Sequence, residues 1–306
     1  MQDLQTWISR YLLDCKYQKA LDSKTLKAYR IDLAQFFGLV EQNGLELTRD
    51  GLMVYISILH QRYKPRTIKR KIASVKAFCG YLEYEELVKE NPFIKLRLKL
   101  NAPLILPRTI PLPAIEAILK TVYQSSATAK TLGQQNTALR DAAVLELLFA
   151  TGVRVSELCA LQTSDVRLGE GEIKIYGKGA KERLVQIANQ DVLNALQSYR
   201  KSYKDAMEKT GMFFVNRLGH PLSDQSVRGI VNKYAKMAGV DAHITPHMFR
   251  HSFATFLLEE GVDIRYIQQL LGHSSIMTTQ IYTHVAGKKQ RDILSEKHPR
   301  NKLHST

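Results

Sequence analysis

Residues 245–284, TPHMFRHSFATFLLEEGVDIRYIQQLLGHSSIMTTQIYTH, hold four histidines, two arginines and two tyrosines in forty residues. Thr245 is a typical helix N-cap and Pro246 suits the first helical position, so the sequence predicts a helix that begins here. His247 and Arg250 are three residues apart and share one face of the first turn, where a helix N-terminus favours anions. A capped amphipathic helix explains the threonine, the proline and the apolar residues, but not two polar groups on one early turn.

A zinc site is the first alternative for this helix. His247 and His251 are four residues apart, a spacing that lets two imidazoles on a helix share a zinc ion. In the metalloprotease motif the residue after the first histidine is the glutamate general base, whereas here it is Met248. No third carboxylate or imidazole ligand stands out nearby in the sequence. The pattern disfavours zinc, and we expect no metal ion at this site.

Two further candidates follow in the same stretch. A second helix with apolar periodicity ends at Gly272, His273 comes next, and a short helix that holds Tyr282 follows. A histidine after a C-capping glycine is usually structural, and an isolated tyrosine usually belongs to a core or an interface. Taken one at a time, neither residue indicates a function.

The composition is that of a basic globular protein. The chain of 306 residues is long enough for two domains with separate cores, and 44% of its residues are hydrophobic. Its formal net charge is +15, of which residues 1–100 contribute +7 and the remainder +8. Basic charge in both halves suits a polyanion that two domains contact, although charge alone is equally compatible with a merely soluble basic protein.

Several locations and protein classes are disfavoured by the sequence. Cys15, Cys79 and Cys159 are far apart and form no CxxC pair, so neither a disulfide framework nor a zinc ribbon is indicated, and a reducing cytoplasm is the expected location. The N-terminus MQDLQTWISRYLLD carries acidic residues early and has no uninterrupted apolar core, unlike a signal peptide. The most apolar run, AAVLELLFATGV, contains Glu146 and is too short for a membrane span. We therefore expect no contact with a membrane.

Residues 1–100 are predicted to form a helical domain. In residues 23–44, SKTLKAYRIDLAQFFGLVEQNG, and again in residues 62–82, apolar side chains recur at helical spacing, and Gly44 is a plausible stop for the first helix. The expected buried faces are Leu26, Tyr29, Leu33, Phe36, Phe37 and Val40 in the first helix, and Ile68, Ile72, Val75, Phe78, Cys79 and Leu82 in the second.

The second of these helices carries charge of one sign, with no acidic residue in residues 62–82. A solvated helix face usually mixes both signs, so the run favours contact with phosphates. The candidate DNA-contacting residues are Arg62, Lys64, Arg66, Lys69, Arg70, Lys71 and Lys76.

Prolines mark a boundary after this domain. Residues 91–113 hold five of the nine prolines, which remove backbone donors and block helix propagation. We therefore expect a helical domain in residues 1–100, a Pro-rich linker in residues 101–113 and a second domain in residues 114–306.

The second domain is predicted to be mainly α with a small β-sheet. Helical periodicity runs through AIEAILKTVYQ and ALRDAAVLELLFATG, and the polar residues 125–137 between them are expected to form a loop. Residues 171–187, GEIKIYGKGAKERLVQI, alternate around a glycine-flanked turn, which predicts a β-hairpin with Lys178 near its tip. Helical periodicity returns from Asp191 onward.

Four motifs in this domain resemble those of one family. ATGVRVSELCAL, GKGAKERLV, PHMFRHSFAT and LLGHSSIMTTQIYTH, in this order across residues 149–284, are similar to motifs of the tyrosine recombinase family, which includes phage integrases and Xer-like proteins. Separated motifs in the right order are far more specific than any one of them. The basic, helical first hundred residues also resemble the family's core-binding domain. The resemblance implies a helical core-binding domain followed by a mixed α/β catalytic domain.

The resemblance also implies a catalytic set. The matched positions are Arg154, Lys178, His247, Arg250, His273 and Tyr282. Lys181 competes with Lys178 for the position of the hairpin lysine. Glu157 matches a supporting acid of the family, and it either braces Arg154 or is an ordinary charge on a helix face.

These residue types suit transfer of a phosphodiester. Arg154 and Arg250 can clamp the non-bridging oxygens, on which charge builds in the transition state. Tyr282 would be the nucleophile, and a free phenol, with a pKa of about 10, needs help to lose its proton. His247 would be the general base or a hydrogen-bond partner, and His273 would donate to a non-bridging oxygen.

The leaving group needs a proton, for which Lys178 is the candidate acid. The product would be a 3′-phosphotyrosyl link, which a 5′-hydroxyl from a partner strand then reverses. No metal or nucleotide cofactor is required, and the glycine-rich GxxxxGK[ST] phosphate loop is missing from the sequence.

The expected function is therefore site-specific recombination of double-stranded DNA that carries paired sites. The resemblance implies that four protomers, monomeric when free, exchange strands through a four-way junction. Two alternatives stay open: a type IB topoisomerase-like nicking and closing enzyme with the same residues, and a DNA-binding regulator that has lost catalysis. The short amphipathic helix of the tail, residues 285–306, needs another surface to pack on; the resemblance favours a neighbouring protomer, and the alternative is the tail's own domain.

Overall fold

The computed structural model describes residues 2–94, 96, 98, 108–177 and 182–272. The chain divides into two compact units, Met1–Leu104 and Ile105–Thr306, and each has its own hydrophobic core. In the part of the chain that the structure describes, no helix is long and apolar enough to cross a membrane.

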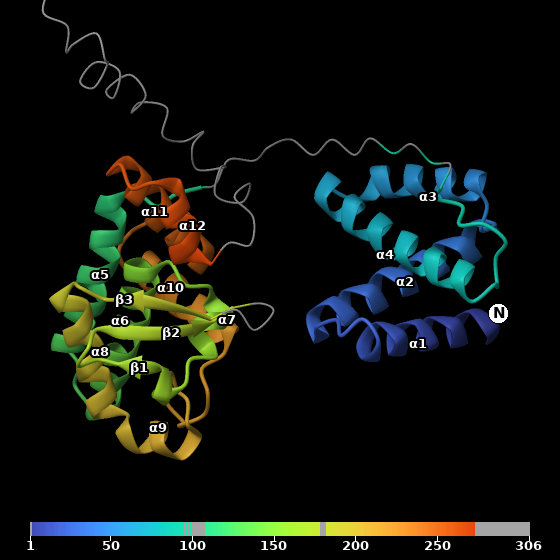
Figure 1. The fold of residues 1–306 in the computed structure, drawn as a ribbon. Coiled ribbons are helices and arrows are strands. Elements are labelled where there is room, and N and C mark those ends of the chain that lie inside the picture. The colour runs from blue at the N-terminus through green and yellow to red at the C-terminus, as the bar shows by residue number, and fades with distance from the viewer. Residues whose placement is uncertain (1, 95, 97, 99–107, 178–181, 273–306) are drawn as a thin grey trace, which may run out of the picture. The chain divides into compact units, whose positions relative to one another are not determined.

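The described residues of the first unit fold into helices, coloured blue to cyan in Figure 1. These are α1 (Gln2–Tyr17), α2 (Ser23–Asn43), α3 (Arg49–Arg62) and α4 (Pro65–Tyr84). The side chain of Asp22 accepts a hydrogen bond from the backbone N–H of Thr25 at the start of α2, and Gly44 ends that helix in the left-handed conformation with φ of 59°. The predicted stop at Gly44 is confirmed.

Apolar periodicity also located the core of this unit. All six residues of the predicted apolar face of α4 are buried, because that face packs on α2 and α3. On α2, Leu33 and Phe36 are buried, and the other four predicted residues are partly buried against the same core.

The second unit is built around α6 (Leu132–Thr151), which packs against α5 (Leu112–Ala127), α8 (Gln190–Ser202) and α11 (Pro246–Glu259). Residues 140–148 of α6 are all buried, so this helix forms the centre of the unit's core. The other helices among the described residues of this unit are α7 (Val155–Cys159), η1 (Thr163–Asp165), α9 (Lys204–Thr210), α10 (Asp224–Met237) and α12 (Ile264–Leu271).

A small antiparallel sheet with the order β1-β2-β3 completes this unit (Figure 1). Its strands are β1 (Val166–Arg167), β2 (Glu172–Tyr176) and β3 (Glu182–Gln186). Ile173 pairs with Val185 and Ile175 pairs with Arg183. The predicted hairpin is confirmed, but its tip, with Lys178 and Lys181, lies outside the described residues.

The loop expected in residues 125–137 is shorter than predicted, because only residues 128–131 lie outside the helices. Helix α5 continues to Ala127, and α6 already begins at Leu132, where the side chain of Thr131 accepts a hydrogen bond from the backbone N–H of Gln134. Glutamine and alanine are good helix formers, and polar residues such as Gln134 and Gln135 are exposed on the first turn of α6. The break between the two helices is therefore confined to residues 128–131, and the polar residues on either side of it are helical.

The end of the proline-rich segment belongs to the second unit. Ile110 is fully buried in its core, and the backbone N–H of Ile110 donates to Oγ of Ser252 at 2.7 Å. Helix α5 begins at Leu112, two residues before the start of the domain expected from the sequence. Packing against α11 therefore orders these residues, although prolines surround them.

Candidate active site

Helix α11 begins at the residue that its local sequence predicts. Thr245 is the N-cap, its side chain accepts a hydrogen bond from the backbone N–H of Met248, and Pro246 stands in the first turn, as predicted. His247 is exposed whereas Arg250 is buried. The same helical turn therefore presents one polar group to solvent and directs the other into the protein.

The rings of His247 and His251 stack with their centroids 5.7 Å apart. Burial, together with the neighbouring charges of His247 and Arg250, lowers the pKa of His251 to about 4. His251 is therefore neutral at neutral pH. Among the residues that the structure describes, no three histidine, cysteine, aspartate or glutamate side chains come together as a metal site would require.

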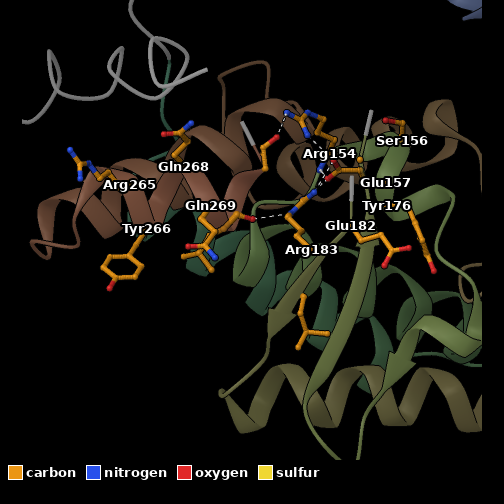
Figure 2. Close-up of a pocket in the computed structure, with 14 residues that line it drawn as sticks. Arg154, Ser156, Glu157, Tyr176, Glu182, Arg183, Arg265, Tyr266, Gln268 and Gln269 are labelled. Carbon is orange, nitrogen blue, oxygen red and sulfur yellow. Dashed lines mark hydrogen bonds and ion pairs between the residues drawn. The ribbon is translucent and has the colours of Figure 1, made fainter. Parts of the chain in front are cut away.

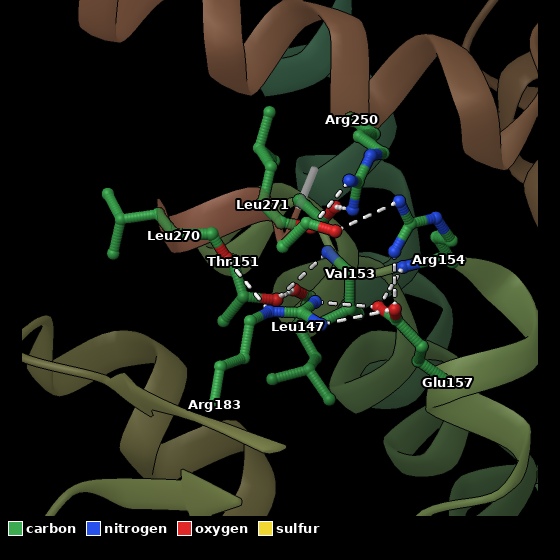
Figure 3. Close-up of polar contacts among 11 residues, drawn as sticks. Leu147, Thr151, Val153, Arg154, Glu157, Arg183, Arg250, Leu270 and Leu271 are labelled. Atoms are coloured by element: carbon green, nitrogen blue, oxygen red, sulfur yellow. Dashed lines mark hydrogen bonds and ion pairs between the residues drawn. The ribbon is translucent and has the colours of Figure 1, made fainter. Parts of the chain in front are cut away.

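Arg250 joins the ends of two other helices. Its side chain is only 2% exposed; Nη1 donates to the carbonyl oxygen of Gly152 at 2.7 Å, and Nη2 donates to that of Leu271 at 2.6 Å (Figure 3). Gly152 ends α6 with φ of 58°, and a Cβ at this position would come within 2.7 Å of the ring of Phe253. A glycine here is therefore required both by backbone conformation and by close packing.

Arg154 stands at the start of α7 and faces solvent more than Arg250 does. Its Nη1 donates to Oε1 of Glu157 at 2.7 Å, and its Nη2 donates to the carbonyl oxygen of Gly272 at 3.3 Å. Its side chain is 35% exposed. Gly272 and Leu271 are neighbours in the chain, so Arg154 and Arg250 bind successive carbonyl groups at the end of α12.

Glu157 is buried and supports Arg154 in two ways. Besides the side-chain contact, its Oε2 accepts a hydrogen bond from the backbone N–H of Arg154 at 2.9 Å. Burial alone would raise the pKa of Glu157, but hydrogen bonds from Arg183 and Arg154 outweigh burial and lower it. The sequence left two roles open for this residue, and a buried, ionised carboxylate between two arginines favours the bracing role.

Arg183 was not found from the sequence. It lies on β3 opposite Ile175, on the face of the hairpin that also carries the buried Val185. A charged residue at a position where the alternation requires an apolar one needs a partner in the interior. That mismatch was the available signal, and Glu157 is the partner, with Nη2 of Arg183 only 2.6 Å from its Oε2.

These groups border an open cleft of about 1240 Å³. Figure 2 shows Arg154, Glu157 and Arg183 on one side and residues of α12, including Arg265, on the other. Gly272, the residue before His273, also lines the cleft. A cleft with several guanidiniums along its wall is suited to an anion such as a phosphodiester.

Of the six candidate catalytic residues, Arg154, His247 and Arg250 are described. Arg154 and Arg250, which are distant in the sequence, are brought together by the end of α12. Lys178, His273 and Tyr282 lie outside the described residues, as does the tail. Their roles stay predictions.

The candidate DNA-contacting residues fall into two groups. Arg62, Lys64, Arg66, Lys69 and Lys76 are exposed. Lys71 is only 3% exposed, and its Nζ lies 3.1 Å from Oδ1 of the fully buried Asp32. Arg70 pairs with the other carboxylate oxygen of Asp32 and is 47% exposed. The structure therefore places Lys71 in the core of the first unit, because a buried carboxylate on α2 needs a buried cation.

Comparisons with known proteins cover both units. The family described as Phage integrase family matches residues 115–289, and the Phage integrase, N-terminal SAM-like domain matches residues 8–86. A tyrosine recombinase of Agathobacter rectalis is 54% identical over 305 residues, which span 99% of this chain and 100% of that protein. Tyrosine recombinase XerC of Thermodesulfovibrio yellowstonii is 38% identical over 311 residues, 99% of each chain.

A solved structure shares the fold. XerH site-specific recombinase bound to palindromic difH substrate, in a post-cleavage complex, has a TM-score of 0.75 at 22% identity, over 92% of this chain and 82% of that chain. The family resemblance seen in the sequence motifs is confirmed, and neither the topoisomerase nor the inactive regulator is favoured. With its catalytic unit and its N-terminal unit both matched, the chain belongs to the phage integrase family of tyrosine recombinases and is a site-specific DNA recombinase.

Proposed function

We propose that this recombinase cuts a DNA strand by attack of the Tyr282 hydroxyl on the scissile phosphate. The attack forms a 3′-phosphotyrosyl bond and releases the 5′-oxygen of the next nucleotide, which takes up a proton. A 5′-hydroxyl from a partner strand then attacks the phosphotyrosyl bond, restores a phosphodiester and frees the tyrosine. Each step breaks one phosphate ester bond and forms another, so the reaction needs no nucleotide cofactor.

One observation carries this proposal: Arg154 and Arg250 donate to the successive carbonyl groups of Gly272 and Leu271. Two guanidiniums that come from separate helices are thereby held next to each other; Arg154 lines the cleft, and Arg250 is buried. Paired guanidiniums with forked donors match the non-bridging oxygens of a phosphate, where charge increases in the transition state.

The remaining roles follow from chemistry and from the family motifs. His247, exposed on the first turn of α11, is the general base or hydrogen-bond partner for Tyr282, and His273 donates to a non-bridging oxygen. Lys178 protonates the 5′-oxygen, with Lys181 as its competitor.

The proposal extends to the assembly. The substrate is double-stranded DNA with paired recombination sites, which both units contact, and four copies of this chain act together on it through a four-way junction. The solved structure of XerH bound to its difH substrate supports DNA as the substrate. The free protein is a monomer in the cytoplasm, where Cys15, Cys79 and Cys159, which form no disulfide, stay reduced.

Covalent trapping tests the proposal. A library of DNA duplexes with a randomised centre, enriched by binding to the full chain, is incubated with wild type and with Tyr282→Phe. Wild type should form a protein–DNA adduct that survives SDS, and sequencing its trapped ends should define one cleavage position. The Phe variant should bind DNA and form no adduct, and an adduct with this variant would assign the nucleophile to another residue.

Plasmids then separate recombination from nicking and closing. A plasmid with two copies of the recovered site should yield deletion or inversion products. Relaxation of a plasmid without the site, at the same enzyme concentration, would contradict the proposed requirement for paired sites.

A further inference from the structure

Arg183 connects three elements of the catalytic unit through one guanidinium. Its Nη1 and Nη2 donate to Oε1 and Oε2 of Glu157 at 3.1 and 2.6 Å, and its Nε donates to the carbonyl oxygen of Leu270 at 2.9 Å. The side chain, which is only 11% exposed, thus ties β3 to α7 and to the end of α12 (Figure 3).

Because Arg183 and Arg154 share the Glu157 carboxylate, Arg183 limits the hydrogen bonds that Arg154 forms with it. An arginine and a carboxylate that meet alone pair through two parallel hydrogen bonds, and the guanidinium is then neutralised by its partner. Here Arg183 takes both oxygens of Glu157, so Arg154 reaches Oε1 with Nη1 only, and its Nη2 turns to the carbonyl of Gly272. Two guanidiniums share one carboxylate, and the group keeps a net positive charge beside the cleft.

Arg183 also acts on the end of α12. The last carbonyl groups of a helix lack partners within the helix and carry partial negative charge. In this protein the carbonyls of Leu270, Leu271 and Gly272 accept hydrogen bonds from Arg183, Arg250 and Arg154, respectively. Three guanidiniums therefore bind three successive carbonyls immediately before position 273.

Gly272 makes room for this arrangement. Its φ is 63°, and a Cβ there would lie 2.9 Å from Nη1 of Arg183. The close approach of Arg183 to the chain at Gly272 therefore depends on a residue without a side chain.

We propose that Arg183 is a positioning residue for DNA cleavage, which prevents Arg154 from closing onto Glu157 and so directs the Arg154 guanidinium to the scissile phosphate. The inference rests on the proposed function, in which Arg154 binds a non-bridging oxygen. Arg183 acts through Arg154 and does not touch the substrate.

Lysine cannot replace Arg183 in this role. An ammonium group can reach the Glu157 carboxylate, but it lacks the planar fork that holds both carboxylate oxygens while Nε binds the carbonyl of Leu270. Arg183→Lys therefore keeps the charge and loses the geometry. Arg183→Gln loses both.

The experiment compares two substrates that carry the site recovered by trapping. One has an ordinary scissile phosphodiester, and in the other a methyl group replaces one non-bridging oxygen, so that the scissile group is neutral. Cleavage rates are measured at saturating full-length enzyme. Binding to one half-site and the thermal unfolding midpoint are measured alongside.

Arg183→Gln should cleave the phosphodiester roughly a hundredfold more slowly, the scale expected for a misplaced binding group. Its loss on the neutral substrate should be much smaller, since little charge is left for Arg154 to stabilise. In an Arg154→Ala background, Arg183→Gln should add almost nothing, because both changes remove the same interaction. Arg183→Lys should likewise lose more of its cleavage rate on the phosphodiester than on the neutral substrate, and its losses should be smaller than those of Arg183→Gln.

Arg167→Gln is the matched control. Arg167 is an exposed arginine on the same sheet, paired with Glu170 on the surface, and its loss should leave both cleavage rates unchanged. The inference would be overturned if Arg183→Gln lost the same factor in cleavage rate on both substrates, or cleaved both at wild-type rates. If the glutamine variant does not fold, the same outcomes for Arg183→Lys would overturn it. Failure of the wild type to form a Tyr282-linked adduct would instead overturn the proposed function.

Discussion

At the scale of single residues, His251 illustrates how the packing around the site changes a titratable group. Its pKa falls from an ordinary value of 6.5 to about 4 because of burial, His247 and Arg250. Between these two pH values the unfolded chain binds a proton at this position and the folded protein does not. Proton binding to the unfolded chain therefore lowers the free energy of unfolding as the pH falls through this window.

His251→Asn should remove this part of the pH dependence. On going from pH 7.5 to pH 5.5, the urea midpoint of the wild type should fall by more than that of the variant. His60→Asn changes an exposed histidine of the other unit and should keep the difference seen in the wild type if that difference arises at His251. Identical pH dependence in His251→Asn and wild type would show that His251 is protonated equally in the folded and unfolded states.

Lys178→Ala tests the proposed general acid. The variant should cleave ordinary DNA slowly, by roughly a hundredfold or more, because the 5′-oxygen is a poor leaving group without a proton. A substrate with sulfur in place of the 5′-bridging oxygen has a good leaving group and should be cut at nearly the wild-type rate. If sulfur does not restore cleavage, the acid is another residue, and Lys181→Ala is the next variant to compare.

At the scale of elements, α4 combines an apolar face with a basic one. The apolar face is buried in the core of the first unit. Within the basic face, Lys71 and Arg70 are paired with Asp32 of α2, which leaves Arg66, Lys69 and Lys76 as exposed basic residues of the helix. The charge that α4 can offer to DNA is therefore smaller than its sequence indicates.

Replacing Arg66, Lys69 and Lys76 together by glutamine should weaken DNA binding and its salt dependence. Each phosphate contact releases condensed counterions, so the slope of log affinity against log salt should flatten by roughly two to three units if each residue meets a phosphate. Fluorescence titrations of one half-site across a salt series measure this slope. An unchanged slope would identify the basic face as an ordinary solvated surface.

Lys71→Met is the contrasting variant on the same helix. It should leave the salt slope unchanged and lower the free energy of unfolding by on the order of 2–3 kcal/mol, because Asp32 would keep only Arg70 as a cationic partner. A flatter slope with unchanged stability would place Lys71 on the DNA instead of in the core.

At the scale of the whole molecule, the proposed action of four copies requires contacts between protomers before any strand is cut. The tail beyond Tyr282, which lies outside the described residues, contains Ile293 and Leu294 among charged residues. A helix this short is marginal in water unless it packs against another surface. Docking into a neighbouring protomer would couple assembly to the placement of Tyr282, only a few residues away.

Truncation after Gly287 tests this coupling. Binding to a single half-site should stay nearly intact, whereas cooperative filling of paired half-sites should weaken and the cleavage rate should change. Gel-shift titrations on one and on two half-sites measure both effects. Equal cooperativity with and without the tail would mean that it packs on its own domain.

Much of the fold follows from interactions between residues close in the chain. The cap at Thr245, the stop at Gly44 and the alternation around Ile173 and Val185 each predicted an element that the structure contains. Such signals need only neighbouring residues, because helix and hairpin periodicity records which side chains face a core. The polar residues 125–137 misled this reasoning since a surface helix and a loop can share the same composition.

The sequence alone thus sufficed for the family, the helical and hairpin segments and the identity of Arg154 and Arg250 as candidates. Tertiary structure decided which charges pair. Arg183 meets Glu157 across 26 residues and Leu270 across 87, and Lys71 meets Asp32 across 39. No local pattern selects among the many possible ion pairs of a chain with 44 basic and 29 acidic residues. Only folding brings a buried carboxylate to its cations, because an unpaired charge in the interior is too costly to leave.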